Sequence, residues 1–218
     1  MSEDPGNLAD TRATYDHVAE EYAARIAGEL AGKPLDRALL ACFVEQVGGL
    51  GLIADIGCGP GHVAAYMHEL GAQVVGIDLS PEMVAIARQR SPDISFEQGS
   101  MLALAQPDAS WGGIVALYSL IHLPPDERPR ALAEFHRVLR LGGLLLLAFH
   151  IGDEQRHLDE WWGQAVSLDT WFLQPPEIEA LLRDAGFFVE MSLVRQPYAP
   201  DIEHQSQRAY IFARKPGE

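Results

Sequence analysis

Residues 52–61 read Leu-Ile-Ala-Asp-Ile-Gly-Cys-Gly-Pro-Gly, and this stretch decides the fold. A short apolar run followed by closely spaced glycines indicates a buried parallel strand that turns directly into a helix. Gly57, Gly59 and Gly61 permit positive φ and let a ligand approach the backbone, and N–H groups at a helix start favour a negatively charged ligand group. Asp55 lies inside the strand, where an unpaired carboxylate is costly, so we expect the glycine turn to donate N–H groups to it.

A second acid follows the next strand. Residues 74–80 read Val-Val-Gly-Ile-Asp-Leu-Ser, and Asp78 lies 17 residues after Gly61, which suits one helix, one turn and one strand. In an open α/β sheet the carboxyl end of this strand lies beside the glycine loop. A carboxylate there can accept hydrogen bonds from both hydroxyls of a ribose.

Strands and helices alternate outward from this unit, which predicts a parallel sheet with helices on both faces. Helices are expected over residues 11–30, 35–47, 60–70, 81–90 and 125–139, the last ended by the glycines at 142 and 143. Strands are expected over residues 50–56, 73–78, 94–97, 114–118 and 144–149, with two further strands over 187–194 and 208–213. Those last two lack a helix between them, so an antiparallel excursion at one sheet edge is the simplest link.

Length and charge narrow the function classes. The chain has 218 residues and a formal net charge of -15, so one domain is expected and nucleic acid and membrane surfaces are disfavoured as partners. Only two cysteines occur, and the eight histidines show no metal-ligand spacing. The first residues lack the features of a secretion signal, so a cytoplasmic protein is expected. The histidine spacing predicts that it binds no metal.

The glycine spacing bears on the cofactor. Dinucleotide enzymes favour G-x-G-x-x-G, whereas this chain has glycines at 57, 59 and 61 and His62 where the dinucleotide pattern has its last glycine. This spacing disfavours an NAD(P)-dependent oxidoreductase, which stays open as an alternative.

The chain resembles the class I S-adenosylmethionine-dependent methyltransferases over about residues 10–215. The matching text is ADIGCGPG at 54–61, VVGIDLSPEMVAIAR at 74–88, FEQGSMLAL at 96–104, IVALYSLIHLP at 114–124 and EFHRVLRLGGLLLLAF at 134–149. The resemblance implies an α/β, Rossmann-like, doubly wound, mostly parallel seven-stranded sheet with an antiparallel last strand and N-terminal lid helices.

A single domain over residues 1–218 follows from the resemblance. Its expected parts are a disordered start at 1–10, lid helices at 11–48, a cofactor-binding core at 49–150, an acceptor-recognition insertion with a helix at 151–186 and a terminal β-hairpin at 187–218.

The resemblance also implies a cofactor site for S-adenosylmethionine. Its amino-acid end would lie against Asp55 and the three glycines, and its ribose against Asp78. The remaining expected cofactor-binding residues are Tyr15, Tyr22, Leu79, Met83, Ser100, Met101, Tyr118 and Ser119. Ser100 stands where the family often has an acid, and its hydroxyl is a weaker acceptor for the adenine amino group.

Catalytic candidates follow from topology, because ligands bind beyond the carboxyl ends of the strands. Tyr118 and His122 follow the fourth strand and His150 the fifth, so these three are the expected catalytic residues, although either histidine could serve structure alone. Tyr15 and Tyr22 share one face of the first helix and are either core aromatics or lid residues whose hydroxyls reach the cofactor.

Aromatic residues gather in the segment after the fifth strand. Trp161, Trp162, Trp171 and Phe172 either cover the sheet or form an aromatic wall for the methyl acceptor. By contrast, the charges of helix 125–139, including Arg128 and Arg137, are expected on a solvated face.

From the resemblance we expect methyl transfer to a small molecule, with a non-catalytic S-adenosylmethionine-binding module as the alternative from another class.

Overall fold

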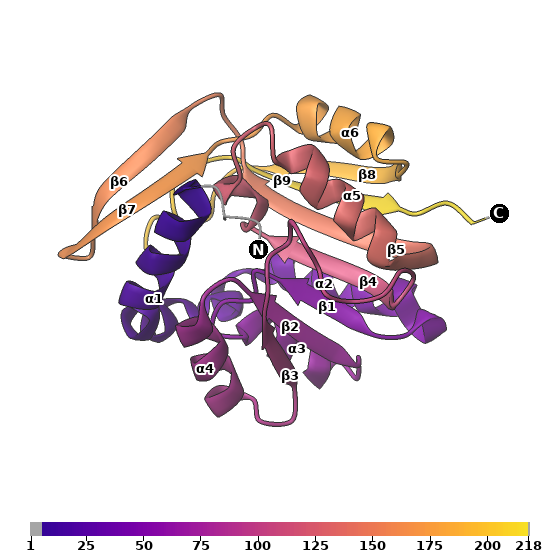
Figure 1. The fold of residues 1–218 in the computed structure, drawn as a ribbon, viewed down its shortest axis with the longest axis horizontal. Coiled ribbons are helices and arrows are strands. Elements are labelled where there is room, and N and C mark those ends of the chain that lie inside the picture. Colours follow the sequence, from indigo (N-terminus) through magenta and orange to yellow (C-terminus); the bar gives the residue numbers. More distant parts are fainter. Residues whose placement is uncertain (1–5, 218) are drawn as a thin grey trace.

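The computed structural model describes residues 6–217 and contains a seven-stranded sheet with the order β3-β2-β1-β4-β5-β9-β8 (Figure 1). Its strands are β1 Ile53–Ile56, β2 Val74–Asp78, β3 Ser95–Gln98, β4 Trp111–Leu117, β5 Leu139–His150, β8 Phe188–Arg195 and β9 Arg208–Arg214. The parallel register aligns Ala54 with Val75 and with Ile114. Only β9 runs antiparallel to its neighbours, so the predicted mostly parallel sheet with an antiparallel last strand is confirmed.

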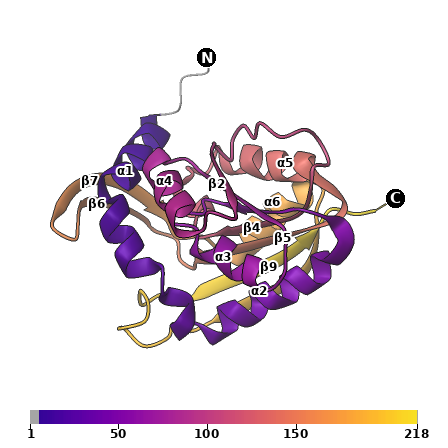
Figure 2. The same ribbon diagram turned by 90° about the horizontal axis from the view of Figure 1, so that it is seen from below.

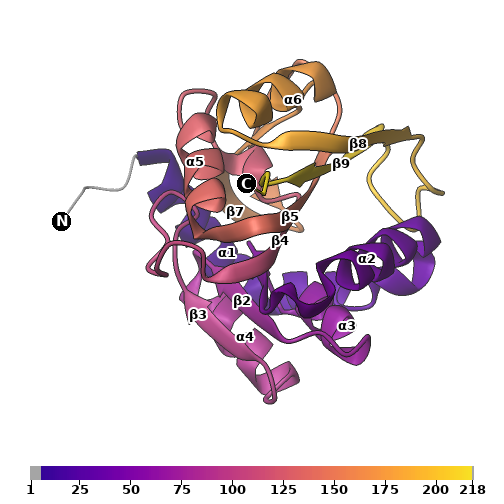
Figure 3. The same cartoon turned by 90° about the vertical axis from the view of Figure 1, so that its right-hand side faces the viewer.

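Helices cover both faces of this sheet (Figure 3). They are α1 Gly6–Ile26, α2 Pro34–Val47, α3 His62–Glu69, α4 Pro81–Arg90, α5 Arg128–Val138 and α6 Pro175–Asp184. Along β5, Leu145 and Leu147 face α5 and α6, whereas Leu144 and Leu146 face the layer of α2, α3 and α4. Residues 144–149 of this strand are all apolar because both faces of the strand are buried there.

A separate two-stranded hairpin projects from the sheet beside α1 (Figures 1 and 2). It consists of β6 Gln155–Trp161 and β7 Gln164–Trp171, joined at Trp162 and Gly163, which both have positive φ as a tight hairpin turn requires. Thr14 on α1 fixes the hairpin, since its Oγ1 donates to the carbonyl of Ser167 at 2.9 Å. Residues 151–175 show no strong hydrophobic period, and the hairpin was not predicted.

Three local features differ from expectation. Helix α1 begins at Gly6, within the expected disordered start, because Leu8 is 5% exposed and packs into the core; residues 1–5 lie outside the described residues. The glycines at 142 and 143 do not end α5 but lie inside β5, where Gly142 pairs with Lys215.

The third difference concerns Arg128, which is 3% exposed rather than on a solvated face. Its Nε donates to the carbonyl of Leu123, and its Nη1 donates to Glu177 on α6 at 2.9 Å. Arg128 therefore joins α5, the preceding loop and α6. No helix within residues 6–217 is long and apolar enough to cross a membrane.

Candidate functional site

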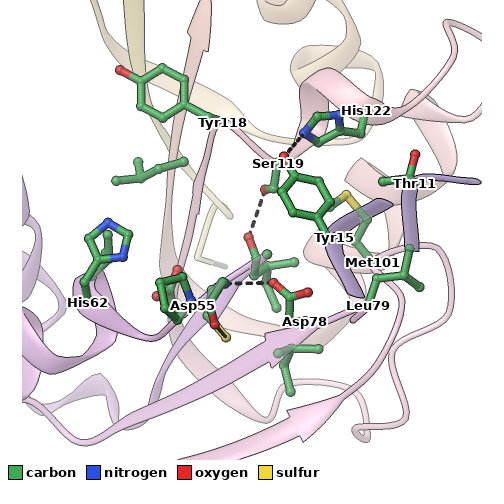
Figure 4. A pocket seen from close by; sticks show the side chains of 18 of the residues that line it. Thr11, Tyr15, Asp55, His62, Asp78, Leu79, Met101, Tyr118, Ser119 and His122 are labelled. Atoms are coloured by element: carbon green, nitrogen blue, oxygen red, sulfur yellow. Dashed lines mark hydrogen bonds between the residues drawn. The ribbon is translucent and has the colours of Figure 1, made fainter. Parts of the chain in front are cut away.

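A cavity of about 1080 Å³, open to solvent at its mouth, lies at the carboxyl ends of β1, β2 and β4 (Figure 4). Residues from α1, the glycine loop and the ends of these three strands line it. We call it the nucleoside cavity. A second cavity, of about 1500 Å³, adjoins it between α1, the β6–β7 hairpin and the loop before β9, and we call it the outer cavity. Tyr15, Tyr22, Glu29, Tyr118 and His122 line both.

Hydrogen bonds to β2 fix the glycine loop. The amides of Gly57 and Cys58 donate to the carbonyl of Ile77 at 2.7 and 3.1 Å. The amide of Gly59 donates to Asp78 Oδ2 at 2.7 Å. These donors are thus used to join the loop to β2, and none of these bonds reaches Asp55, contrary to expectation.

The three glycines serve two different purposes. A Cβ on Gly57, where φ is +73°, would lie 2.4 Å from the Cβ of Ser119, and one on Gly61, where φ is +80°, would lie 2.8 Å from the ring of Phe96. A Cβ on Gly59 would meet only the ring of Tyr22, at 3.7 Å. Gly57 and Gly61 therefore permit close packing, while Gly59 keeps the cavity floor open.

Asp55 lies on this floor with one unpaired oxygen. The residue is 2% exposed, and its Oδ2 has no hydrogen-bond partner within residues 6–217. Burial and the charge of Asp78 raise the pKa of Asp55 to about 7, although a bond from the amide of Ala64 lowers it. The N-terminal turn of α3 thus supplies the donor that the glycine turn was expected to supply, and the free oxygen remains available to a ligand.

Asp78 has both oxygens engaged by backbone amides, since Ser80 donates to Oδ1 at 2.9 Å and Gly59 donates to Oδ2. Burial raises the pKa of Asp78 to about 6, and these two bonds limit the rise. A carboxylate oxygen has two lone pairs, so each can still accept a hydrogen bond from a ligand hydroxyl. The backbone bonds hold the carboxylate in a fixed orientation at the cavity wall.

The nucleoside cavity carries a one-sided charge. Four carboxylates line it, and none of the lysines and arginines of residues 6–217 is among its lining residues. The four are Glu29, Asp36, Asp55 and Asp78. Such a lining favours a ligand with positive charge.

Tyr15 and His122 form a hydrogen-bonded pair at the boundary between the cavities (Figure 4). The Nδ1 of His122 lies 3.2 Å from the carbonyl of Asp169, which only accepts, so Nδ1 carries the proton. The Nε2 atom therefore accepts from the hydroxyl of Tyr15 at 2.9 Å. Burial lowers the pKa of His122 to about 4, so the ring is neutral at pH 7.

Tyr118 separates the cavities with its ring. It has φ of +55°, an uncommon conformation for a bulky residue and one that clusters at functional sites. Its hydroxyl points away from Asp55 (Figure 4) and lies 3.3 Å from the hydroxyl of Tyr210, which donates to Asp36 at 2.8 Å. The hydroxyl of Tyr118 is therefore directed away from the floor of the nucleoside cavity.

His150 lines the outer cavity only. Its Nδ1 lies 2.7 Å from the Oγ of Ser206, and its ring centroid lies 5.0 Å from that of Tyr118. Burial, followed by the charges of Arg208, His204 and Lys33, lowers the pKa of His150 to about 3. The imidazole is therefore a neutral group in a positively charged surrounding.

Most of the sequence-predicted residues line the nucleoside cavity. These are Tyr15, Tyr22, Asp55, Gly57, Gly59, Asp78, Leu79, Ser100, Met101, Tyr118, Ser119 and His122. Gly61 and Met83 pack beside it without lining it, and Met83 is fully buried.

Only two of the four aromatic residues expected to form a wall, Trp161 and Phe172, line the outer cavity within the described part of the chain. Trp162 stacks on Trp161 at 4.6 Å, and Trp171 packs against the core. Sequence reasoning missed the basic residues of this cavity, Lys33, Arg156 and Arg208. They come from three distant segments, and no local pattern marks them.

No group of three or more histidines, cysteines or acids within the described part of the chain is arranged to hold a metal ion.

Comparisons with known proteins agree with this architecture. Residues 53–143 match a family model described as a methyltransferase domain. A probable methyltransferase, ltbC, from Aspergillus luteorubrus is 30% identical over 163 residues, covering 62% of this chain and 56% of that protein. A demethylmenaquinone methyltransferase from Chlorobaculum parvum is 39% identical over 92 residues, covering 42% of this chain and 37% of that protein. The chain thus spans about a third to a half of the length of these relatives.

One solved structure matches over the whole length. The magnesium protoporphyrin IX methyltransferase of Synechocystis superposes with a TM-score of 0.73 at 16% identity, covering 99% of this chain and 100% of that chain. At this identity the similarity concerns the fold.

Proposed function

Because the chain belongs to the class I S-adenosylmethionine-dependent methyltransferases, we propose that it transfers a methyl group from S-adenosylmethionine to a small molecule bound in the outer cavity. The observation that carries the proposal is the pair of carboxylates, buried Asp55 and half-buried Asp78, in a cavity whose lining includes four acids and, within residues 6–217, no lysine or arginine.

The residues of the nucleoside cavity fit this cofactor. The unpaired Oδ2 of Asp55 suits the ammonium group of the amino-acid end, because a buried carboxylate oxygen without a donor gains most from a charged one. Asp78, held by two amides, has lone pairs left for the ribose hydroxyls. Leu79 and Met101 offer apolar surface to the adenine, and Ser100 offers a hydroxyl to its edge.

S-adenosylmethionine, when bound, would supply a methyl group on a sulfonium, whose carbon a nucleophile attacks in line while the neutral thioether S-adenosylhomocysteine leaves. The protein's share is mainly alignment and exclusion of water, and well-oriented reactants can gain about 7–11 kcal/mol from this. Tyr15, Tyr22 and Tyr118, which line both cavities, are suited to this role.

The two histidines are weak bases in this setting. With pKa values of about 4 and about 3, His122 and His150 are poorly matched to removing a proton at neutral pH. Tyr15 does not change this, because its hydroxyl donates to His122 Nε2, so a proton relayed through it would still end on that imidazole. An acceptor that arrives already deprotonated needs no such transfer.

The proposal is tested first by ligand-induced stabilisation. S-adenosylhomocysteine at 100 times its Kd should stabilise the protein by about 2.7 kcal/mol, whereas NAD should produce no shift in Tm. A shift with NAD alone would support the oxidoreductase alternative and refute the proposal.

A matched pair of variants locates the site. Asp78→Asn should weaken S-adenosylhomocysteine binding at least tenfold in calorimetry, while Asp108→Asn, whose side chain is 78% exposed, should leave it unchanged. A cofactor-consumption assay against a diverse metabolite panel then separates an enzyme from a non-catalytic module, because only the enzyme releases S-adenosylhomocysteine in the presence of an acceptor.

A further inference from the structure

The outer cavity gathers basic side chains in an acidic protein. The chain has 16 lysines and arginines and a net charge of -15, yet Lys33, Arg156 and Arg208 all line this one cavity. Only two carboxylates, Glu29 and Glu203, line it with them. The lining therefore has an excess of positive charge, the reverse of the nucleoside cavity.

Arg208 is the most buried of these basic residues, at 2% exposed. Its Nη1 donates to the carbonyl of Ser206 at 2.7 Å. Its Nε lies 3.1 Å from Glu203 Oε2, but this contact lacks the angle of a hydrogen bond, and Nε has no hydrogen-bond partner within residues 6–217. A guanidinium has five N–H donors, so most of those of Arg208 are uncommitted.

Glu203 does not neutralise the charge of Arg208 fully, because its carboxylate also contacts Arg195 and Lys33. Arg195 forms two hydrogen bonds with its carboxylate, one of them at 3.0 Å, and Lys33 Nζ lies 4.0 Å away. Lys33 is 4% exposed and has its closer partner in Glu29, at 2.6 Å. Arg208 is thus the member of this cluster with the weakest counter-charge.

A second basic group, Arg156, lines the same cavity beside His204. The guanidinium of Arg156 lies 4.5 Å above the ring of Phe172 and its Nη1 is 3.3 Å from Nε2 of His204, while its Nε and Nη2 donate to Glu154. Burial, followed by the nearby positive charges, lowers the pKa of His150 and that of His204. Both rings are therefore neutral, and the arginines supply the positive charge in this part of the cavity.

Most of the remaining wall is apolar or aromatic, apart from His122, His157 and Thr170. Leu158, Trp161 and Leu168 come from the hairpin and Ile121 from the loop after β4, while Tyr15 and Tyr22 face them from α1. Trp161 contacts both tyrosines edge to face, at 5.8 and 5.6 Å. A ligand that fills this cavity therefore meets an apolar wall at one end and guanidinium groups at the other.

We propose that the outer cavity binds an amphipathic organic anion, an aromatic or apolar body carrying a carboxylate, with the anionic oxygens on Arg208. That this anion is the methyl acceptor rests on the proposed function, whereas the prediction that the outer cavity binds it does not. A carboxylate matches the free donors of a guanidinium in number and direction.

A pair of fluorescent probes that differ in charge tests the proposal. 1-Anilinonaphthalene-8-sulfonate is an aromatic anion, and N-phenyl-1-naphthylamine is its neutral analogue. Both are titrated into the full chain with and without saturating S-adenosylhomocysteine, so that failure of the cofactor site is seen separately. We expect saturable binding of the anion at one site. Arg208→Met should weaken it at least tenfold and should weaken the neutral probe less than twofold.

Arg183→Met, on α6 with a side chain 58% exposed, is the matched control and should change neither affinity. Arg156→Met, at a largely exposed side chain, should weaken the anion at least threefold, and it decides the question if the Arg208 variant does not fold. Aromatic carboxylates should displace the anion, and their amides should not. Equal weakening of both probes, no saturable site for the anion, or unchanged affinity in the variants would overturn the proposal.

Discussion

Replacing Asp55 by asparagine should make the ligand-free protein more stable at pH 8 and should destroy its affinity for S-adenosylhomocysteine. Burial and the neighbouring charge of Asp78 raise the pKa of Asp55 from 3.8 to about 7. The folded chain therefore keeps a proton that the unfolded chain releases, so the free energy of unfolding falls as the pH rises from 3.8 towards 7. Asparagine carries no charge and escapes this loss.

The size of the effect follows from the shift. Each pKa unit corresponds to about 1.36 kcal/mol, so a rise from 3.8 to about 7 is worth roughly 4 kcal/mol above pH 7. The asparagine amide would place a buried donor where the oxygen has no partner, which costs about 2 kcal/mol. A net gain of about 2 kcal/mol remains, which should raise Tm by at least about 4 °C in a chain of this length.

Thermal unfolding of wild type and Asp55→Asn between pH 4 and pH 8 measures this. The difference in Tm should be smallest at pH 4 and largest at pH 8, and calorimetry at pH 8 should give at least a tenfold loss of S-adenosylhomocysteine affinity. Asp108→Asn controls for the removal of one charge at an exposed site. A variant no more stable than wild type at pH 8, or a difference independent of pH, would refute the reasoning.

Three further substitutions follow from the same geometry. Gly57→Ala should lower the free energy of unfolding by about 3 kcal/mol or more and abolish S-adenosylhomocysteine binding. Gly71→Ala, at a residue with φ of +91° but open space around the added Cβ, should lower the free energy of unfolding by only about 1–2 kcal/mol. Chemical denaturation of the two variants measures this difference. Tyr22→Phe should weaken S-adenosylhomocysteine binding by about 1 kcal/mol in calorimetry if its hydroxyl reaches the ligand, and an unchanged Kd would contradict that role. Arg128→Met should lower the free energy of unfolding by about 1–2 kcal/mol in urea, since its hydrogen bonds are buried, and a change below about 0.5 kcal/mol would restore the solvated-face interpretation.

The sheet and the nucleoside cavity could be predicted because their signals are local. The apolar run ending in glycines and the acid after the next strand each lie within about ten residues. The topology of a parallel sheet then brings Asp55 and Asp78 to the same cavity. Helix starts such as Ser80-Pro81 are local in the same sense, and the Ser80 hydroxyl does cap α4 through the amide of Met83.

The outer cavity could not be predicted because its parts come together only through tertiary packing. Lys33, Arg156 and Arg208 are more than fifty residues apart, and each is set by a different element. The β6–β7 hairpin is half-exposed and polar on one side, so it lacks the apolar run that marked the core strands. Even the donor to Asp55 was misassigned, because the glycine turn bonds to β2 and leaves the start of α3 to supply it.

The opposite charges of the two cavities bear on how one site handles two ligands. A sulfonium and an ammonium would be attracted by Asp55 and Asp78 in the nucleoside cavity, and an organic anion would be attracted by the guanidinium groups of the outer cavity. Lys33 and Arg208 both lie 5.8 Å from the Tyr118 ring, so the change of sign occurs across a single residue. Each ligand would then be repelled from the other's cavity, which orients the pair before any reaction. Burial keeps His122 neutral, which suits this order of charge, because a protonated ring at the boundary would repel the cation that the carboxylates attract.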